Sequence, residues 1–367
     1  MFSKAFLDLP IDKFVSESLL IPESQVLSTL NKSSFSFNDL PVLLSPTAQN
    51  YIELLARRSQ ELTRQRFGNV IQLFIPMYLS NECFNSCSYC GFSLEHDYPR
   101  KTLTDSEIIN EAKLLSDKGY RHILILTGES PKKVDVDYIS NAIKLIKPFF
   151  SSIGIEIQPL KEFEYKKLID SGADNLTLYQ ETYHLDSYLK FHTRGIKRNY
   201  ANRLNCLEEG AKAGFFKINI GALLGLYDWR YEAFSLAYHL KYMMSTYWNI
   251  KYSISFPRIQ SMIGSFIKPY PVTDINMVQL ITVFRLLFPD LGITLSTREP
   301  AKFRDNIVGL GITTLSAESN TSPGGYSGCD SEEQFSINDT RDLNSIMNML
   351  KNNGLDPVFK DWDYSLM

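Results

Sequence analysis

The sequence contains few cysteines and no long run of apolar residues. Its strongest apolar stretches end at about ten residues, whereas a helix that spans a membrane requires roughly 20, so we expect no membrane insertion. The five cysteines are an odd number, and the start of the chain, Met1 to Lys4, lacks the apolar core of a signal peptide. We therefore expect reduced thiols, no disulfide framework and a cytoplasmic location.

A strong excess of one charge is also missing. Thirty-eight basic residues stand against 41 acidic ones, which gives a formal net charge of −3. Because nucleic-acid binding generally relies on a positive field, we expect no nucleic-acid partner. A small-molecule substrate or a protein partner is the better expectation. Hydrophobic residues form 44% of the chain, which is enough to build a substantial core.

Three of the five cysteines lie close together in the sequence. Cys83, Cys87 and Cys90 form a C-x3-C-x2-C array directly after an apolar segment, at the expected end of a strand. Three soft thiolates at this spacing suit an iron–sulfur cluster or zinc. No fourth cysteine lies nearby, so a cluster held by this array would keep one iron open to another ligand.

The array has one further reading, and two more cysteines lie outside it. A zinc site could recruit His96 as a fourth ligand, although zinc sites usually pair their cysteines two by two. The remaining cysteines, Cys206 and Cys329, lie far from the array, and we expect packing or incidental roles for them.

From residue 68 onward the pattern alternates between two kinds of segment. Short apolar, β-branched runs predict strands at 70–79, 122–127, 153–160, 175–180, 217–226, 252–257, 292–297 and 312–317. Longer helical patterns lie between them, at 104–118, 138–149, 199–213, 229–247 and 273–287. Eight strands, each followed by a helix, predict an α/β protein with a (β/α)8 barrel of the TIM type.

The rest of the chain flanks this barrel. Residues 1–67 are mostly helical in pattern and are expected to form an N-terminal extension. The barrel is assigned to 68–320 and a C-terminal cap to 321–367. No repeat, low-complexity tract or Pro/Gly-rich linker divides the barrel, so we expect a single catalytic unit.

Polar residues stand at the ends of most of the predicted strands. In β/α barrels the chemistry gathers where the strands run into the following loops, so these residues are expected to line one cavity beside the thiols. A cavity of this kind could hold a zwitterionic ligand. The residues concerned are Thr127, Gly128, Glu129, Glu156, Gln158, Tyr179 to Glu181, Ser255 to Arg258, Ser296 to Glu299 and Ser316 to Ser319.

Several of these stretches resemble one enzyme family. They are CSYCGF at 87–92, ILTGE at 125–129, EIQPL at 156–160, YQETYH at 179–184, SFPR at 255–258, LSTRE at 295–299 and KDWD at 360–363. The cysteine array alone resembles the radical S-adenosylmethionine (SAM) superfamily. Together, the stretches resemble the 2-iminoacetate synthases, the radical SAM tyrosine lyases of thiamine thiazole biosynthesis, from about residue 40 onward.

The resemblance implies a role for each cofactor-binding position. Cys83, Cys87 and Cys90 would bind a 4Fe-4S cluster. Tyr89 would contact the SAM adenine or the substrate, and Thr127, Gly128 and Glu129 would accept from the methionine ammonium of SAM. Glu156 would bind the ribose hydroxyls and Arg203 the SAM carboxylate, which suits a carboxylate acceptor and a guanidinium fork.

For the substrate, the resemblance implies that Arg298 and Ser316 anchor the carboxylate of L-tyrosine. The implied reaction breaks the Cα–Cβ bond of tyrosine to give 2-iminoacetate and p-cresol, while SAM becomes methionine and 5′-deoxyadenosine. The implied partners are the thiazole synthase and an electron donor of the flavodoxin or ferredoxin type.

Three alternatives remain open at this stage. The related tyrosine lyase of iron-hydrogenase assembly carries an extra C-terminal domain with a second three-cysteine site, and the last cysteine here is Cys329, so that activity is not expected. A tryptophan lyase or biotin-synthase-like enzyme would share the same fold. A non-catalytic iron–sulfur or zinc scaffold would need the cysteines, yet it would have no use for Glu129, Glu156, Arg203 and Arg298.

Overall fold

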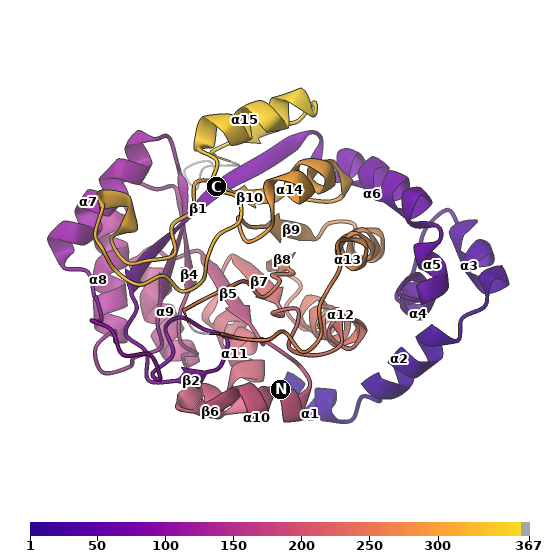
Figure 1. The fold of residues 1–367 in the computed structure, drawn as a ribbon, viewed down its shortest axis with the longest axis horizontal. Helices are drawn as coiled ribbons and strands as arrows, with labels where there is room; N and C mark the ends of the chain where they lie inside the picture. The colour runs from indigo at the N-terminus through magenta and orange to yellow at the C-terminus, as the bar shows by residue number, and fades with distance from the viewer. Residues whose placement is uncertain (264, 361–367) are drawn as a thin grey trace.

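The computed structural model describes residues 1–263 and 265–360. Within these residues, eight parallel strands close into a barrel (Figure 1), because β10 pairs with β1 as well as with β9. In their order around the barrel the strands are β1 (Val70–Ser80), β3 (His122–Thr127), β4 (Ser152–Glu156), β5 (Asn175–Tyr179), β7 (Lys217–Gly221), β8 (Lys251–Ser255), β9 (Gly292–Leu295) and β10 (Thr314–Ser316). The predicted (β/α)8 barrel is confirmed.

Helices surround the barrel and connect its strands. They are α7 (Asp105–Asp117), α8 (Val136–Ile146), α9 (Glu162–Ser171), α10 (Leu185–Phe191), α11 (Tyr200–Ala213), α12 (Trp229–Thr246), α13 (Asp274–Leu287) and α14 (Ala301–Ile307). The sequence marks the ends of α7 clearly. Thr104 forms a capping box with Glu107, whose carboxylate accepts from the Thr104 backbone N–H at 2.8 Å. Gly119, at φ +102°, follows the helix end.

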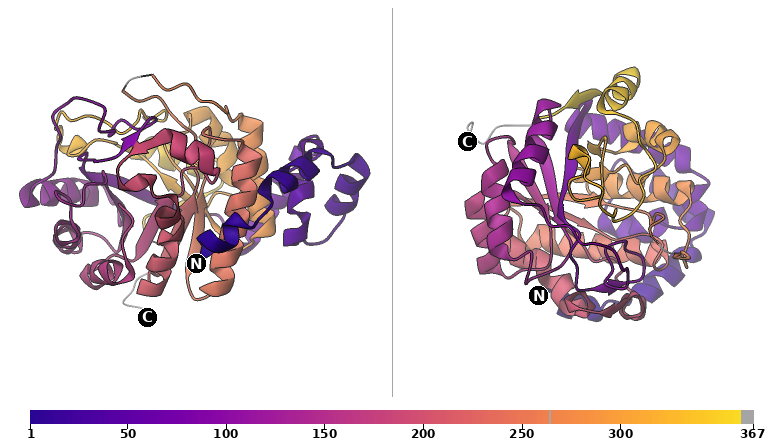
Figure 2. Two further views of the ribbon diagram at one scale, coloured as in Figure 1. Left: turned by 90° about the horizontal axis from the view of Figure 1, so that it is seen from below. Right: turned by 60° about the vertical axis from the view of Figure 1, so that its left-hand side comes forward.

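The N-terminal helices lie along one side of the barrel (Figure 2). They are α1 (Phe2–Leu7), α2 (Ile11–Leu19), α3 (Glu23–Leu30), α4 (Leu40–Leu43), α5 (Pro46–Gln49) and α6 (Ile52–Phe67), with a 3-10 turn η1 (Phe37–Asp39). Buried contacts attach this extension to the barrel helices. Phe2 stacks on His239 of α12 with ring centroids 3.9 Å apart, and its backbone N–H donates to Glu208 of α11 at 2.7 Å.

The carboxyl-terminal part of the chain returns to the first strand. After β10 it forms α15 (Leu343–Asn352) and β11 (Asp356–Val358), which runs parallel to the start of β1 at Val70–Gln72. The smaller elements of the chain are β2 (Ser86–Cys87), β6 (His192–Arg194), η2 (Ile196–Arg198), η3 (Val308–Leu310) and η4 (Gly325–Ser327). No helix among the described residues is both long and apolar enough to cross a membrane.

The two faces of the barrel strands differ in polarity. On β5 and β7 the outward-facing side chains are apolar and at most 2% exposed, and they pack in the main core: Leu176, Leu178, Ile218 and Ile220. The inward-facing positions are polar, and they line a cavity of about 650 Å³ within the barrel: Asn175, Thr177, Lys217 and Asn219. Barrel interiors are usually filled by bulky apolar residues. The stabilising core of this protein therefore lies between the strands and the helices.

Because only the outward face is tightly packed, truncating a side chain there should lower the free energy of unfolding more than truncating one on the inward face. Ile220→Ala, on the outward face, should lower the free energy of unfolding by about 2–5 kcal/mol because it leaves a cavity in a packed layer. Thr177→Ala, on the inward face, should cost less than about 1 kcal/mol. Urea unfolding of the two variants compares them directly, and equal losses would show that the interior is packed as tightly as the outer layer.

Candidate active site

The cysteine loop begins where β1 ends. Cys87 lies on β2, which pairs antiparallel with β6, so that Cys87 is opposite His192. Burial raises the pKa of Cys83, Cys87 and Cys90, to about 11 for Cys90. Negative charge on Cys83 raises the pKa of the other two further, which places the three thiols in one neighbourhood. The three thiols therefore lie near one another after the end of β1, with Cys87 buried and Cys83 and Cys90 partly exposed.

Amide groups point toward two of these sulfur atoms. The Asn85 Nδ2 atom lies 3.8 Å from the Cys83 sulfur, and Gln334 Nε2 lies 3.9 Å from the Cys90 sulfur. All five cysteines are free thiols, as expected. Within the described ranges, no three His, Cys, Asp or Glu side chains are grouped to hold a single metal ion.

Tyr89, between the second and third cysteines, is held by His192. The Tyr89 hydroxyl lies 2.6 Å from His192 Nε2, and His192 Nδ1 lies 2.7 Å from the Tyr188 carbonyl oxygen. A carbonyl only accepts, so Nδ1 carries the proton and Tyr89 donates to Nε2. Burial, with the charge of Lys197, lowers the pKa of His192 to about 3, which keeps the imidazole neutral.

Arg203 connects the ends of β3 and β5. Its Nη1 donates to Glu129 at 2.8 Å, its Nη2 to Glu181 at 2.9 Å, and its Nε to the Tyr179 carbonyl at 2.7 Å. Glu129 also accepts from Asn85 Nδ2 at 2.8 Å. These bonds account for three of the five guanidinium N–H groups. The predicted SAM ligands Glu129 and Arg203 therefore lie together and already form a buried ion pair.

Lys197 adds a second cation to this cluster. Its ammonium donates to Glu181 at 2.7 Å and lies 5.9 Å from the centre of the Tyr89 ring. Burial alone would raise the pKa of Glu181, but Lys197 and Arg203 lower it to about 2. Glu181 adopts φ +71°, a strained conformation for a residue with a side chain. Two carboxylates thus face two cations beside the thiols.

Thr127 and Gly128 complete the same rim. A Cβ atom at Gly128 would lie 2.2 Å from the Glu82 carbonyl oxygen, so only glycine fits against the cysteine loop. The Thr127 hydroxyl and both side-chain amide atoms of Gln180 are buried without a hydrogen-bond partner. Since buried polar atoms are normally paired, these groups offer contacts to a polar ligand.

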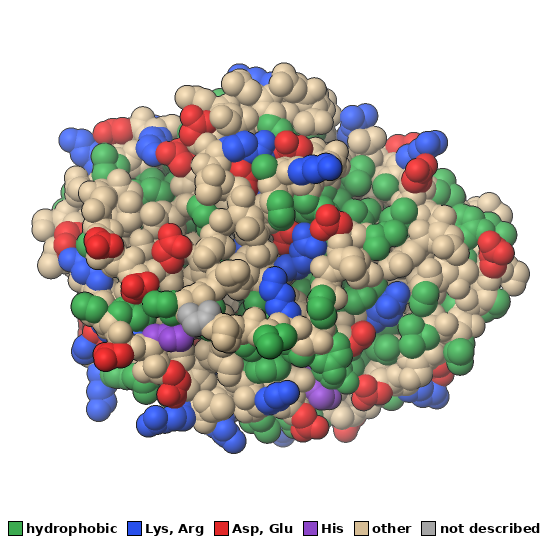
Figure 3. All heavy atoms as spheres, viewed as in Figure 1, with side chains coloured by type: hydrophobic (Ala, Val, Ile, Leu, Met, Phe, Trp, Pro, Cys, Tyr) green, Lys and Arg blue, Asp and Glu red, His purple; other side chains and the backbone are tan. Residues whose placement is uncertain are grey.

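A second part of the rim forms a cavity of its own. Glu156, Arg298 and Ser316 line it together with apolar walls that include Phe74 and Leu124. Figure 3 shows charged side chains of both signs near the middle of this face, over the barrel. Gln334 also lines the cavity while its amide approaches Cys90, so the cavity adjoins the cysteine loop.

Arg298 is arranged to bind an anion. Its guanidinium lies 3.2 Å from the centre of the Phe335 ring, and no hydrogen bond or ion pair joins its side chain to another described residue. Ser316 accepts from the Thr297 backbone N–H at 3.1 Å, which leaves its own hydroxyl proton available. A cation and a hydroxyl donor in one cavity suit a carboxylate.

The pKa of Glu156 is higher than that of an ordinary glutamate. Burial raises its pKa to about 7, and the charge of Glu181 adds to this rise, whereas Arg298 lowers it. The carboxyl group is therefore partly protonated near neutral pH. It lies within the cavity at the end of β4, where the sequence predicted it.

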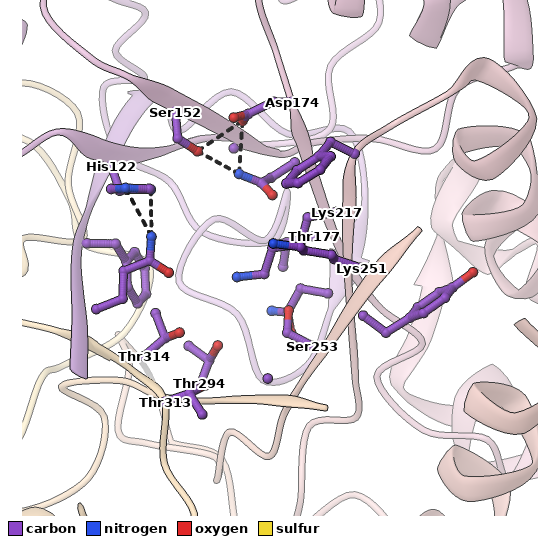
Figure 4. A pocket seen from close by; sticks show the side chains of 18 of the residues that line it. His122, Ser152, Asp174, Thr177, Lys217, Lys251, Ser253, Thr294, Thr313 and Thr314 are labelled. Atoms are coloured by element: carbon purple, nitrogen blue, oxygen red, sulfur yellow. Dashed lines mark hydrogen bonds between the residues drawn. The ribbon is translucent and has the colours of Figure 1, made fainter. Parts of the chain in front are cut away.

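The larger cavity is a different space. The space of about 650 Å³ occupies the amino-terminal half of the barrel and is lined by His122, Lys217 and Lys251, among others (Figure 4). Tyr179 lines it, but the thiols, Glu129, Glu156, Arg203, Arg298 and Ser316 do not. The rim of the barrel, and not this larger of the two cavities, carries the candidate site because the cysteines and the Arg298 cation lie there.

Comparisons with known proteins identify the family of the chain. The Radical SAM superfamily model matches residues 77–237, and the Biotin and Thiamin Synthesis associated domain matches residues 255–356. The 2-iminoacetate synthase of Escherichia coli is 43% identical over 343 residues, which cover 93% of this chain and 91% of that protein. The chain belongs to the 2-iminoacetate synthase family. It is thus a radical SAM enzyme and a lyase by family, and the resemblance found in the sequence is confirmed.

Two solved structures extend the comparison to the fold. The hydrogenase maturase HydG from Carboxydothermus hydrogenoformans has a TM-score of 0.90 and 30% identity, covering 98% of this chain and 85% of that chain. The methylornithine synthase PylB has a TM-score of 0.73 at 21% identity, covering 91% of this chain and 97% of that one. The second likeness shows the shared barrel alone.

Sequence reasoning missed three residues of this family member's site. Asn85, His192 and Lys197 hold the predicted residues in place, yet only Asn85 lies within a motif that the pattern singled out, and there as an unassigned position of the cysteine array. His192 and Lys197 come from the irregular stretch after α10, whose pairing with the cysteine loop depends on the tertiary fold. The stretch YQETYH pointed to Glu181, which binds Lys197, but not to Lys197 itself.

The contact between Tyr89 and His192 can be measured by a double-mutant cycle. His192→Leu leaves the buried Tyr89 hydroxyl unpaired, which should cost about 1–3 kcal/mol of unfolding free energy. Combined with Tyr89→Phe, the loss should be smaller than the sum of the single losses by about 1 kcal/mol.

A matched control for this cycle pairs His192→Leu with Tyr252→Phe. Tyr252 lies on β8 and its hydroxyl donates to the Met243 carbonyl at 3.0 Å, away from the cysteine loop. That pair should be additive. Additivity in both cycles, measured by denaturant unfolding, would contradict the hydrogen bond.

Proposed function

We propose that this enzyme cleaves the Cα–Cβ bond of L-tyrosine to 2-iminoacetate and p-cresol, in the service of thiamine thiazole biosynthesis. The relatives that share 43% of its residues are named 2-iminoacetate synthase. The observation that carries the proposal is the Arg298 guanidinium, which stacks on Phe335 but has no hydrogen-bond or ion-pair partner among the described residues. It shares a cavity with Ser316 and Glu156 beside three thiols. An amino-acid carboxylate is the anion that this position suits.

The residues of the rim fit the family's cofactors. Cys83, Cys87 and Cys90 would hold a 4Fe-4S cluster, whose thiolate ligands they can supply from one loop. SAM would contact Tyr89, the turn of Thr127, Gly128 and Glu129, Glu156 and Arg203. The unpaired buried atoms of Thr127 and Gln180 support a polar ligand at this place. When bound, the cluster and SAM supply the one-electron chemistry that removes a hydrogen atom from the substrate.

In this proposal, the ion pair between Arg203 and Glu129 persists when SAM binds. The ion pair between them fixes the guanidinium plane, and the two remaining N–H groups of Arg203 can bind a carboxylate. Glu129 accepts from both Asn85 and Arg203. A carboxylate has about four acceptor sites, so it retains capacity for the SAM ammonium.

Substrate positioning falls to the second part of the rim. Arg298 would grip the tyrosine carboxylate, and the Ser316 hydroxyl would add a third hydrogen bond. Holding the head group at two points fixes the amine relative to the cysteine loop, which is the orientation that a single hydrogen transfer requires. Apolar walls and the Phe335 ring exclude water from the same cavity.

Other parts of the proposal follow from the family. The thiazole synthase would receive 2-iminoacetate, and a flavodoxin or ferredoxin type of donor would supply electrons. A cytoplasmic location suits reduced thiols. We also propose three parts of the chain: an extension over 1–67, the radical SAM barrel over 68–320 and a cap over 321–367.

Anaerobic product analysis tests the reaction. Cluster-loaded enzyme with reductant, SAM and tyrosine should yield 5′-deoxyadenosine and p-cresol, whereas tryptophan in place of tyrosine should yield no indole product. Cys87→Ala should lose most of its bound iron and all product, because one cluster ligand is removed. Cys329→Ser, which changes a cysteine outside the array, should retain both.

Several results would contradict this scheme. Unchanged iron content in Cys87→Ala would refute the ligand set. Wild-type enzyme that forms 5′-deoxyadenosine from SAM but no p-cresol would refute the tyrosine lyase activity while leaving the radical SAM chemistry in place.

Glu156 predicts a pH dependence of nucleoside binding. Its pKa of about 7 means that the carboxylate form, which accepts from a ribose diol, increases as the pH rises from 6 to 8. Binding of 5′-deoxyadenosine, a neutral ligand, should tighten several-fold over this range. In Glu156→Gln the affinity should be nearly independent of pH, and calorimetric titration of both proteins decides. A parallel pH profile in the two proteins would exclude Glu156 as the ribose ligand.

A further inference from the structure

A chain of buried hydrogen bonds runs through the wall of the barrel below the substrate cavity. Ser253 Oγ on β8 donates to Asn219 Oδ1 on β7 at 3.1 Å, and Asn219 Nδ2 donates to Ser255 Oγ at 2.9 Å. The three side chains are between 1% and 9% exposed. Burying such groups costs free energy unless they are paired, so a polar chain at this depth needs an explanation beyond packing.

The chain begins in one cavity and ends in the other. Ser253 and Asn219 line the larger, lower cavity, where Ser253 points inward from β8 (Figure 4). Ser255 lines the upper cavity that also contains Arg298 and Ser316. The last hydroxyl of the chain is therefore presented to the proposed substrate.

A second hydroxyl stands beside Ser255. Tyr179 and Ser255 both approach Gly221, which lies between them on β7, and Tyr179 lines both cavities. Strand register pairs Tyr179 with Gly221 and Gly221 with Ser255. A Cβ at Gly221 would lie 2.5 Å from the Tyr179 ring, so the glycine lets this ring cross β7 toward Ser255.

These hydroxyls lie deeper in the barrel than the carboxylate anchor. Ser255 pairs with Thr294, and Thr294 pairs with Thr314, so Ser316 is two residues nearer the carboxyl ends of the strands. Phe74 and Leu124 supply apolar surface in the same cavity. Phe74 pairs with Ser316 across β1 and β10, so apolar surface lies beside the carboxylate anchor. The cavity thus offers a charge and a hydroxyl near the rim, apolar surface beside them and the Ser255 hydroxyl deeper, which suits the head group, ring and hydroxyl of tyrosine.

We propose that Ser255 and Tyr179 bind the phenol hydroxyl of the substrate, with Asn219 as a positioning residue, and that they distinguish tyrosine from phenylalanine. This inference rests on the proposed function. Ser255 accepts from Asn219 Nδ2 at 2.9 Å, whereas its own hydroxyl meets Asn219 Oδ1 only at 3.4 Å, an oxygen that already accepts from Ser253. The Ser255 hydroxyl proton can therefore turn from this long contact to a phenol in the cavity. A phenol in the cavity can accept from one of the two hydroxyls and donate to the other.

Hydrogen bonds to the phenol hydroxyl explain how the site would prefer tyrosine to phenylalanine. A site built to hydrogen-bond a substrate hydroxyl rejects the analogue that lacks it, because its own polar groups are then buried unpaired. We expect the wild-type dissociation constant for phenylalanine to exceed that for tyrosine by at least about 100-fold.

Equilibrium dialysis tests this ratio without turnover. Enzyme with an oxidised cluster and SAM, but no reductant, is dialysed anaerobically against labelled tyrosine or phenylalanine. Ser255→Ala and Tyr179→Phe should each reduce the ratio of the two dissociation constants at least tenfold, chiefly by weakening tyrosine. Thr294→Val, which changes a hydroxyl in the same cavity without changing its size, should keep the wild-type ratio.

The outcomes separate the two proposals. If wild-type enzyme makes p-cresol but both Ser255→Ala and Tyr179→Phe retain the full preference for tyrosine, the phenol site is wrong and the lyase stands. If Thr294→Val removes the preference instead, the hydroxyl pair has been misassigned. Should Tyr179→Phe fail to fold, judged by circular dichroism, Ser255→Ala alone decides.

Discussion

The buried guanidinium of Arg203 holds the candidate site together. It donates to groups at the ends of β3 and β5, and through Glu129 and Asn85 it reaches the cysteine loop. A charge buried without its partner costs about 3–5 kcal/mol, so two carboxylates and two cations must be placed together or not at all. This requirement fixes the loop with the thiols relative to the strand ends, although the loop itself has little regular structure.

The two parts of the rim around this charged cluster differ in polarity. The side of the rim near the thiols is rich in paired charges, while the cavity under Arg298 combines a single cation with apolar walls. The paired charges suit a zwitterionic cofactor, and the lone cation suits the head group of an amino acid. Gln334 bridges the two parts, since it approaches Cys90 and lines the cavity.

Much of the fold could be predicted from the sequence because its signals are local. Alternating strand and helix patterns gave all eight barrel strands, and the capping box at Thr104 marked a helix start to within one residue. The cysteine spacing and the strand-end rule placed the candidate site. The supporting residues could not be found in this way. His192 and Lys197 act only once β6 pairs with the cysteine loop, a contact across about a hundred residues that no local pattern encodes.

The polar lining of the barrel interior has a bearing on how such an enzyme can diversify. Because the apolar layer between the strands and the helices forms the packed core, the inward positions on β5, β7 and β8 add little apolar packing, and those in the buried hydrogen-bond chain can change provided that their polar atoms stay paired. Exchanges at Thr177, Asn219 or Ser253 can therefore reshape what the interior accepts while the scaffold persists. Proteins with this architecture can therefore acquire new substrates through substitutions inside the barrel while they keep the same fold.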